Sequence, residues 1–72
     1  MIKEGKGSLS DVAAEYVREQ ILKGVLHQKE KIVENDIAVE LGMSRGPVRE
    51  ALKQLKYEGF LDYETNKGYS VS

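Results

Sequence analysis

Cysteine is absent from this sequence of 72 residues, and histidine occurs only once. Without cysteine, neither a disulfide framework nor a thiolate metal site can support a small fold, which must therefore rest on its apolar core. The single histidine, His27, has no second His or Cys to join it as a ligand, so we interpret it as an ordinary surface or turn residue. The sequence thus predicts no metal site.

Long apolar runs are also missing, and none approaches the ~20 residues that a membrane-spanning helix needs. The first eight residues, MIKEGKGS, lack the hydrophobic segment of a signal peptide. These two absences predict a cytoplasmic protein with no membrane partner.

Catalytic constellations are equally scarce. A chain this short buries only roughly 60% of the surface that its unfolded form exposes, which leaves little interior for a catalytic pocket. The sequence holds no credible Ser/His/Asp set, no P-loop and no Gly-rich phosphate loop. We therefore expect a binding module rather than an enzyme, with no catalytic residue and no cofactor.

The chain does contain a succession of short amphipathic segments. Residues 1–8 carry glycine and charged side chains with little to bury, which predicts a flexible N-terminal arm, and residues 9–72 should form one domain. Ser8 or Ser10 can cap a first helix, which Gly24 ends. The apolar side of this helix should comprise residues at helical spacing, namely Leu9, Val12, Ala13, Tyr16, Val17 and Ile21.

A brief strand and a short helix are expected next. The β-branched pair Ile32 and Val33 favours a strand. A second helix should run from about Glu34 and end at Gly42, with Ile37, Ala38 and Leu41 on its apolar side. It has only about two turns, so it can persist only if it packs against another element.

The third helix has the clearest pattern in the chain. Ser44 can cap it through its hydroxyl group, Pro47 is tolerated in its first turn, and Gly59 ends it. Only Gly42, Met43 and Ser44 separate it from the second helix, and so tight a turn predicts a helix-turn-helix. The inward side should be formed by Val48, Ala51, Leu52 and Leu55.

Two alternating segments close the sequence. Residues 60–64 and 69–71 alternate apolar and polar side chains, and residues 65–68 between them have turn chemistry. They predict a hairpin that covers the third helix and that Ile32 can join as a third strand. The fold class is therefore mainly α with a small antiparallel hairpin: a winged helix-turn-helix of three helices and a two- to three-stranded wing sheet.

Four basic residues, Arg45, Arg49, Lys53 and Lys56, are spaced along one side of the third helix and are called the basic stripe below. An α-helix fits the major groove of DNA, and arginine matches the O6 and N7 atoms of guanine. We predict that Arg45 and Arg49, near the helix start, read bases, and that Lys53 and Lys56 bind phosphates. A solvated helix face would explain the same charges, because Glu50 shares the outer side, so charge alone leaves both interpretations open.

Neighbouring residues suit the same role. Gly46 has no side chain where the backbone would come closest to DNA, and Ser44 can offer its hydroxyl and the free N–H groups of the helix start to a phosphate. Asn66, Lys67 and Gly68 form either an ordinary tight turn or a wing tip that enters the minor groove, where the potential is strongly negative.

The run ELGMSRGPVREALKQLKYEGFLDYETNKGYSV, residues 40–71, closely resembles the DNA-binding domain of the GntR family of bacterial transcription regulators. The shared features are Ser-Arg-x-Pro-Val-Arg-Glu-Ala-Leu, the later Glu-Gly pair and Asn-x-Gly before the last strand. The resemblance covers roughly residues 9–72, and the Pro-Val pair is most like the FadR branch.

The resemblance implies both a set of contacts and a regulatory role. It places Ser44, Arg45, Gly46, Pro47 and Arg49 in the major groove, Asn35 at a phosphate, and Asn66, Lys67 and Gly68 at the wing contacts. Family members bind palindromic operators in double-stranded DNA as homodimers and respond to a metabolite held by a separate C-terminal domain. We expect that domain to be absent from these 72 residues, and we expect the whole protein to repress transcription.

Three places depart from the family pattern. The connection after the first helix commonly carries Pro-Gly, whereas this chain has Gln28-Lys29, so we expect a looser turn there. Many relatives have Thr where Gly46 lies, so one side-chain contact to DNA is absent. Val33 stands where Asn, Ser or Thr often caps the second helix, which costs about 1 kcal/mol of local stability.

The alternative hypothesis is a winged helix that binds another protein, with the basic stripe against an acidic partner.

Overall fold

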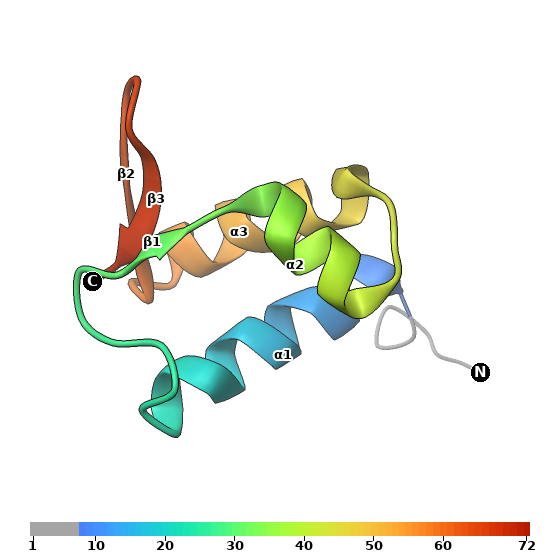
Figure 1. Cartoon of the computed structure of the whole chain (residues 1–72), viewed down its shortest axis with the longest axis horizontal. Helices are drawn as coiled ribbons and strands as arrows, with labels where there is room; N and C mark the ends of the chain where they lie inside the picture. Colours follow the sequence, from blue (N-terminus) through green and yellow to red (C-terminus); the bar gives the residue numbers. More distant parts are fainter. Residues whose placement is uncertain (1–7) are drawn as a thin grey trace.

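The computed structural model describes residues 8–72. Its elements follow in the order α1 (Leu9–Leu22), β1 (Lys31–Ile32), α2 (Glu34–Leu41), α3 (Arg45–Tyr57), β2 (Leu61–Glu64) and β3 (Gly68–Val71). Figure 1 shows three helices beside a small sheet, from which the β2–β3 hairpin projects as a wing. The winged helix-turn-helix fold expected from the sequence is therefore confirmed, while most of the proposed N-terminal arm, residues 1–7, lies outside the described residues.

Helix α1 begins and ends at residues with the expected chemistry. The Ser8 hydroxyl accepts a hydrogen bond from the backbone N–H of Asp11 at 3.1 Å. After the C-terminal cap Lys23, the chain turns at Gly24, whose φ of 80° is favourable only for glycine. Of the two serines that the sequence offered as caps, Ser8 is the one used.

The packed side of α1 is narrower than the sequence predicts. Leu9 and Val12 were expected there, but they are 53% and 45% exposed, and the buried residues are Ala13, Ala14 and Val17. Helix α1 packs mainly against α3, so only a narrow strip of the α1 surface is covered. Leu9 and Val12 lie outside this buried strip.

The connection between α2 and α3 is the predicted three-residue turn. Gly42 ends α2 in the left-handed conformation, with a φ of 65°, and the N–H of Met43 bonds to the carbonyl of Ala38 at 3.0 Å. Ser44 is the N-cap of α3. These two helices therefore form the helix-turn-helix.

The sheet has the strand order β1-β3-β2, with both pairs antiparallel. Ile32 joins the hairpin as a third strand, as expected, and pairs with Tyr69, but the short strand is Lys31–Ile32 rather than residues 32–33. Val33 instead serves as the N-cap of α2 and makes no side-chain capping bond there. The strand prediction was shifted by one residue because β-branched character alone cannot distinguish a strand residue from an extended helix cap.

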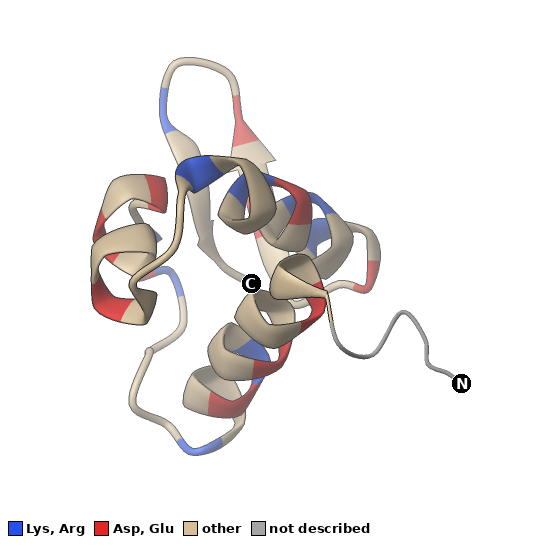
Figure 2. Cartoon of the chain, turned by 90° about the vertical axis from the view of Figure 1, so that its right-hand side faces the viewer, with Lys and Arg blue, Asp and Glu red and all other residues tan. Residues whose placement is uncertain are grey.

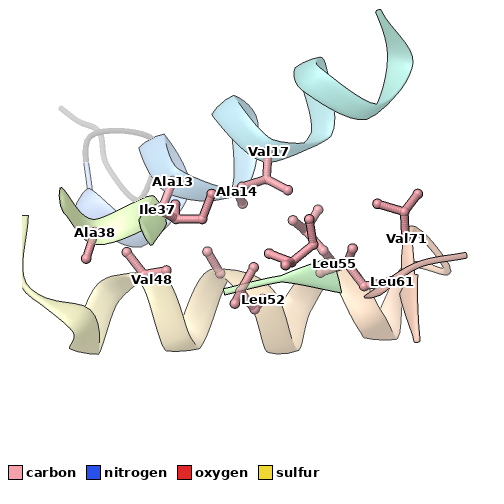
Figure 3. Packing of buried hydrophobic residues seen from close by; sticks show 12 residues of the cluster. Ala13, Ala14, Val17, Ile37, Ala38, Val48, Leu52, Leu55, Leu61 and Val71 are labelled. Carbon is pink, nitrogen blue, oxygen red and sulfur yellow. The ribbon is translucent and has the colours of Figure 1, made fainter. Parts of the chain in front are cut away.

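The core lies between α1 and α3 and is closed at one end by the sheet. Figure 3 shows Val17 of α1 facing Leu52 and Leu55 of α3, with Leu61 and Val71 at the sheet end. All four predicted inward residues of α3 are at most 1% exposed. Burial of this whole inner side fixes the rotation of α3 and leaves its opposite side free.

Candidate nucleic-acid interface

The outer side of α3 carries the basic stripe. All four of its residues, Arg45, Arg49, Lys53 and Lys56, are exposed. Figure 2 shows basic segments along α3, whereas acidic segments predominate on α1 and α2. The molecule is close to neutral overall, and four of its eleven Lys and Arg residues lie on the outer side of α3.

Helix α3 starts with backbone N–H groups that no capping side chain occupies. Ser44 is the N-cap, yet its hydroxyl makes no capping hydrogen bond, so the expectation that it accepts one from the first turn is wrong. The free N–H groups and hydroxyl together could bind an anion such as a phosphate oxygen. Pro47, in the first turn, is half-buried and has no N–H to satisfy.

The fold does not require glycine at position 46. A Cβ atom added there would meet nothing within 4 Å, and its φ is not among the positive values found at other glycines. The protein interior therefore offers no reason for glycine at this exposed position of a helix. Its small size leaves room for something outside the chain.

Arg49 is the member of the basic stripe that another helix holds. Its Nε donates to Oε2 of Glu34 at 3.1 Å, and its Nη2 donates to Oε1 at 3.2 Å. These hydrogen bonds and the carboxylate charge raise the pKa of Arg49 above its ordinary value. The Arg49 side chain is nevertheless 57% exposed, so it is oriented by α2 while remaining accessible.

The other basic residues of α3 are held less firmly. Lys53 Nζ lies 3.9 Å from Glu50 on the same helix, a long and exposed contact. Among residues 8–72, neither Arg45 nor Lys56 forms an ion pair. The basic stripe thus consists of one oriented side chain and three that can adjust their positions.

Glu58, at the end of α3, is turned away from the stripe. It accepts a hydrogen bond from Gln54 at 2.9 Å and one from Arg18 of α1 at 2.8 Å, and these bonds lower the pKa of its carboxyl group. The Arg18 guanidinium also lies over the Phe60 ring, 5.6 Å from its centre. This acidic residue therefore fastens α3 to α1.

Asn35 lies exposed in the first turn of α2, where the family resemblance implies a phosphate contact. Its neighbours Glu34 and Asp36 are acidic, which suits the positive end of the helix dipole but repels a phosphate. Asn35 is neutral and a hydrogen-bond donor, so of these three side chains it is the one compatible with a phosphate contact.

The wing tip is a tight turn fixed mainly by backbone. Asn66 and Gly68 have φ values of 71° and 84°, and the N–H of Lys67 bonds to the carbonyl of Glu64 at 2.9 Å. Lys31 of β1 donates a hydrogen bond from Nζ to the carbonyl of Lys67, and this bond connects the wing tip to β1. The Lys67 side chain is 75% exposed, with its ammonium 3.9 Å from Glu64.

Two tyrosines stiffen the wing below its tip. Tyr63 and Tyr69 face each other across β2 and β3, with ring centres 4.9 Å apart and planes tilted by 59°. Burial, followed by the nearby Tyr63 and Glu34, raises the pKa of Tyr69. Aromatic cross-strand pairs of this kind stabilise a hairpin by about 0.2–1 kcal/mol.

Three features of this surface were missed from the sequence: Glu34 as the partner of Arg49, Lys31 as the support of the wing tip, and the Tyr63–Tyr69 pair. Only the tyrosine pair left a signal, because two aromatic residues occur at similar distances from a predicted turn. No three His, Cys, Asp or Glu side chains gather as a metal site within residues 8–72. In the same range, no helix is long and apolar enough to cross a membrane.

Residues 9–71 match the family model described as bacterial regulatory proteins, gntR family. The chain belongs to the GntR family. It contains the winged helix-turn-helix domain with which members of this family of transcription regulators bind DNA. This result assigns the chain to regulatory proteins rather than enzymes.

Known GntR proteins resemble the chain in sequence and in structure. The uncharacterized HTH-type transcriptional regulator YdhC of Bacillus subtilis is 32% identical over 56 residues, which are 78% of this chain and 25% of that protein. The Nta operon transcriptional regulator of Aminobacter aminovorans is 50% identical over 40 residues, or 56% of this chain and 19% of that protein. A solved GntR-family transcriptional regulator from Pseudomonas syringae superposes with a TM-score of 0.80 and 38% identity, covering 89% of this chain and 27% of the other.

The chain therefore spans about a quarter or less of the length of these relatives. They identify the domain but not the activity of a whole protein. Placement in the FadR branch stays a prediction.

Proposed function

We propose that this GntR domain binds a specific sequence in double-stranded DNA, with α3 in the major groove and the wing in the minor groove. The observation that carries the proposal is the outer side of α3, where exposed basic side chains project from a helix whose inner side is completely buried. A helix that cannot rotate presents its side chains in a fixed register, which sequence reading requires.

The residues divide by chemistry. Arg45 and Arg49 read bases, since arginine can donate two hydrogen bonds to guanine. Ser44, Asn35, Lys53 and Lys56 bind phosphates, and Gly46 and Pro47 allow the backbone to approach the groove. At the wing, Lys67 enters the minor groove between Asn66 and Gly68.

The proposal extends to the full-length regulator. We propose that this regulator is a cytoplasmic, metabolite-responsive repressor. It forms a homodimer through a C-terminal effector domain, and the dimer binds a palindromic operator. The match of residues 9–71 to the family, and the greater length of the relatives, support this role. A single copy of the domain should bind one half-site weakly.

Salt-dependent binding tests the proposal against the protein-interaction alternative. We expect the chain to bind mixed duplex DNA, with an affinity that falls linearly on logarithmic axes as salt rises, by about 0.9 in slope for each neutralised phosphate. The variant Lys53→Gln on α3 should reduce this slope, because Lys53 is proposed to bind a phosphate. Its matched control is Lys23→Gln at the end of α1, which lies far from the wing tip in Figure 1. Absence of binding even at low salt would favour the protein-interaction alternative.

Selection of bound duplexes from a random pool tests sequence preference. Fusing the domain to a dimerising segment restores two half-sites, so the enriched sequences should be palindromic and should give the half-site spacing directly. Enrichment of no common sequence would contradict specific recognition while leaving non-specific binding possible.

A further inference from the structure

Glu34 lies outside the residues proposed to touch DNA, and it makes the most extensive contact with one of them. Its two carboxylate oxygens accept from Nε and Nη2 of Arg49 at 3.1 and 3.2 Å. The Glu34 side chain is 26% exposed, less than half as much as that of Arg49. The pair connects the first turn of α2 with the first turns of α3 across the helix-turn-helix.

The geometry of the guanidinium determines what this contact leaves free. Arginine carries five N–H donors in one plane, one on Nε and two on each Nη. Glu34 occupies the edge formed by Nε and Nη2. The second edge, formed by Nη1 and the remaining N–H of Nη2, makes no hydrogen bond to any of residues 8–72.

A guanine base needs only one such edge. In the major groove it presents two acceptors, O6 and N7, which match a pair of parallel N–H donors. A carboxylate on one edge and a guanine on the other can therefore bind the same guanidinium simultaneously. The Glu34 contact is compatible with base reading by Arg49 and does not compete with it.

We propose that Glu34 is a positioning residue for sequence recognition, holding Arg49 by its Nε edge so that the Nη1 edge is presented to guanine. This inference rests on the proposed function, since it assumes that Arg49 reads a base. Arginine loses considerable rotamer freedom when it is fixed in one geometry. The ion pair already restricts the Arg49 rotamer before DNA binds, so less side-chain entropy is lost when the guanine contact forms.

The Glu34 charge also has an effect of opposite sign on general affinity. A carboxylate near the phosphate backbone weakens attraction to every duplex, whatever its sequence. Glu34 therefore improves the preference for the correct site by orienting Arg49, while its charge lowers the affinity for correct and incorrect sites alike. Arg45 has no comparable ion pair within residues 8–72, so its base contact should be more tolerant of changes in α2.

The test compares two isosteric substitutions in the first turn of α2, Glu34→Gln and the control Asp36→Asn. Each removes one negative charge from the same helix end, but within the described residues only Glu34 binds Arg49. Affinities of the 72-residue chain are measured by fluorescence anisotropy for a selected half-site duplex and for duplexes with each base pair changed. Arg49→Ala identifies the base pair that Arg49 reads, as the one whose preference disappears.

At that base pair we expect Glu34→Gln to reduce the preference by at least about threefold, out of the roughly 5- to 150-fold that a bidentate contact supplies. Asp36→Asn should leave the preference unchanged, and both variants should bind duplexes that lack the correct base pair slightly more tightly. Thermal unfolding of each variant checks that the fold is retained, and Glu34→Ala provides a second measurement if the glutamine variant unfolds.

Three results would overturn the inference. An unchanged preference in Glu34→Gln, with Arg49→Ala losing it, would reject Glu34 as a positioning residue while leaving the proposed function intact. A higher preference in Glu34→Gln would mean that Glu34 blocks Arg49. If Arg49→Ala kept every base preference of the parent chain, the base-reading role of Arg49 would be removed and, with it, the role of Glu34.

Discussion

Helix α3 and the wing both present side chains to the proposed DNA surface, but the rest of the molecule holds them differently. Four side chains on the inner side of α3 are buried, and Glu34 orients an arginine on its outer side. In the wing, β2 and β3 bury one residue each, Leu61 and Val71, and both lie at its base. The tip depends on its turn geometry and on one hydrogen bond from Lys31.

This difference indicates a division of labour. Hydrogen bonds to base edges require fixed geometry, which a packed helix supplies. Attraction of a lysine to the negative minor groove tolerates movement, because it depends on charge more than on direction. We therefore expect α3 to determine which sequence is bound, and the wing to add affinity for all sequences.

The largest effect is expected where the support of α3 is removed. Leu52→Ala deletes a side chain with 0% exposure in the centre of the core, and it should lower the free energy of unfolding by about 2–5 kcal/mol. Urea denaturation followed by far-UV circular dichroism measures this. Lys56→Ala, on the outer side of the same helix, is the control and should change stability by less than about 0.5 kcal/mol. Equal midpoints for the two variants would show that the core does not hold α3 as described.

The next effect separates α3 from the wing by specificity. Arg49→Ala should abolish the preference for guanine at one position, a loss of about 1–3 kcal/mol of discrimination. Gel-shift titrations with an operator and a scrambled duplex measure the preference. Lys67→Ala should retain it, because the wing lysine contacts no base edge in our proposal. If Arg49→Ala binds the operator as well as the parent protein does, α3 does not read sequence through this residue.

A smaller effect concerns the wing turn. Gly68 has a φ of 84°, and a Cβ atom added there would meet nothing within 4 Å, so alanine should cost about 1–2 kcal/mol through backbone strain alone. Gly46→Ala is the matched control on α3, where an added Cβ also meets nothing and alanine favours the helix. Urea midpoints should therefore move in opposite directions for the two substitutions. A shift in the same direction would contradict the difference in backbone conformation.

The smallest effect is expected in the salt dependence of the wing contact. Lys67→Ala should reduce the slope of log affinity against log salt by about one, equally for operator and non-specific duplexes. Lys23→Ala removes the same charge at the end of α1 and should leave the slope unchanged. Equal slopes for both variants and the parent chain would mean that the wing does not neutralise a phosphate.

The helix-turn-helix and hairpin could be predicted because their signals are local. Gly42, Ser44 and Pro47 mark the turn and the start of α3, and the apolar period of α3 identifies all four of its buried residues. The Glu34–Arg49 pair could not be predicted in this way, since it joins residues 15 positions apart whose approach depends on the crossing of two helices. The same applies to Lys31 and the carbonyl of Lys67, which are 36 positions apart.

The errors at α1 and α2 have a different cause. Helical spacing shows which side of α1 is apolar but not how much of that side a neighbour covers, so Leu9 and Val12 were placed inside. Val33 has the composition of a strand residue and an extended backbone, yet it precedes a helix. In both places the sequence indicates the local conformation, and tertiary packing decides what that conformation is used for.

The strand order has a consequence for synthesis of the chain. β3 comes after every other described element in sequence but lies in the middle of the sheet, between β1 and β2. Neither outer strand has a sheet partner until residues 68–71 have left the ribosome, whereas α1, α2 and α3 are already complete by residue 57. The sheet can therefore form only after the three helices have been synthesised, and a chain truncated before Gly68 would contain α1, α2 and α3 but would leave both β1 and β2 without a sheet partner.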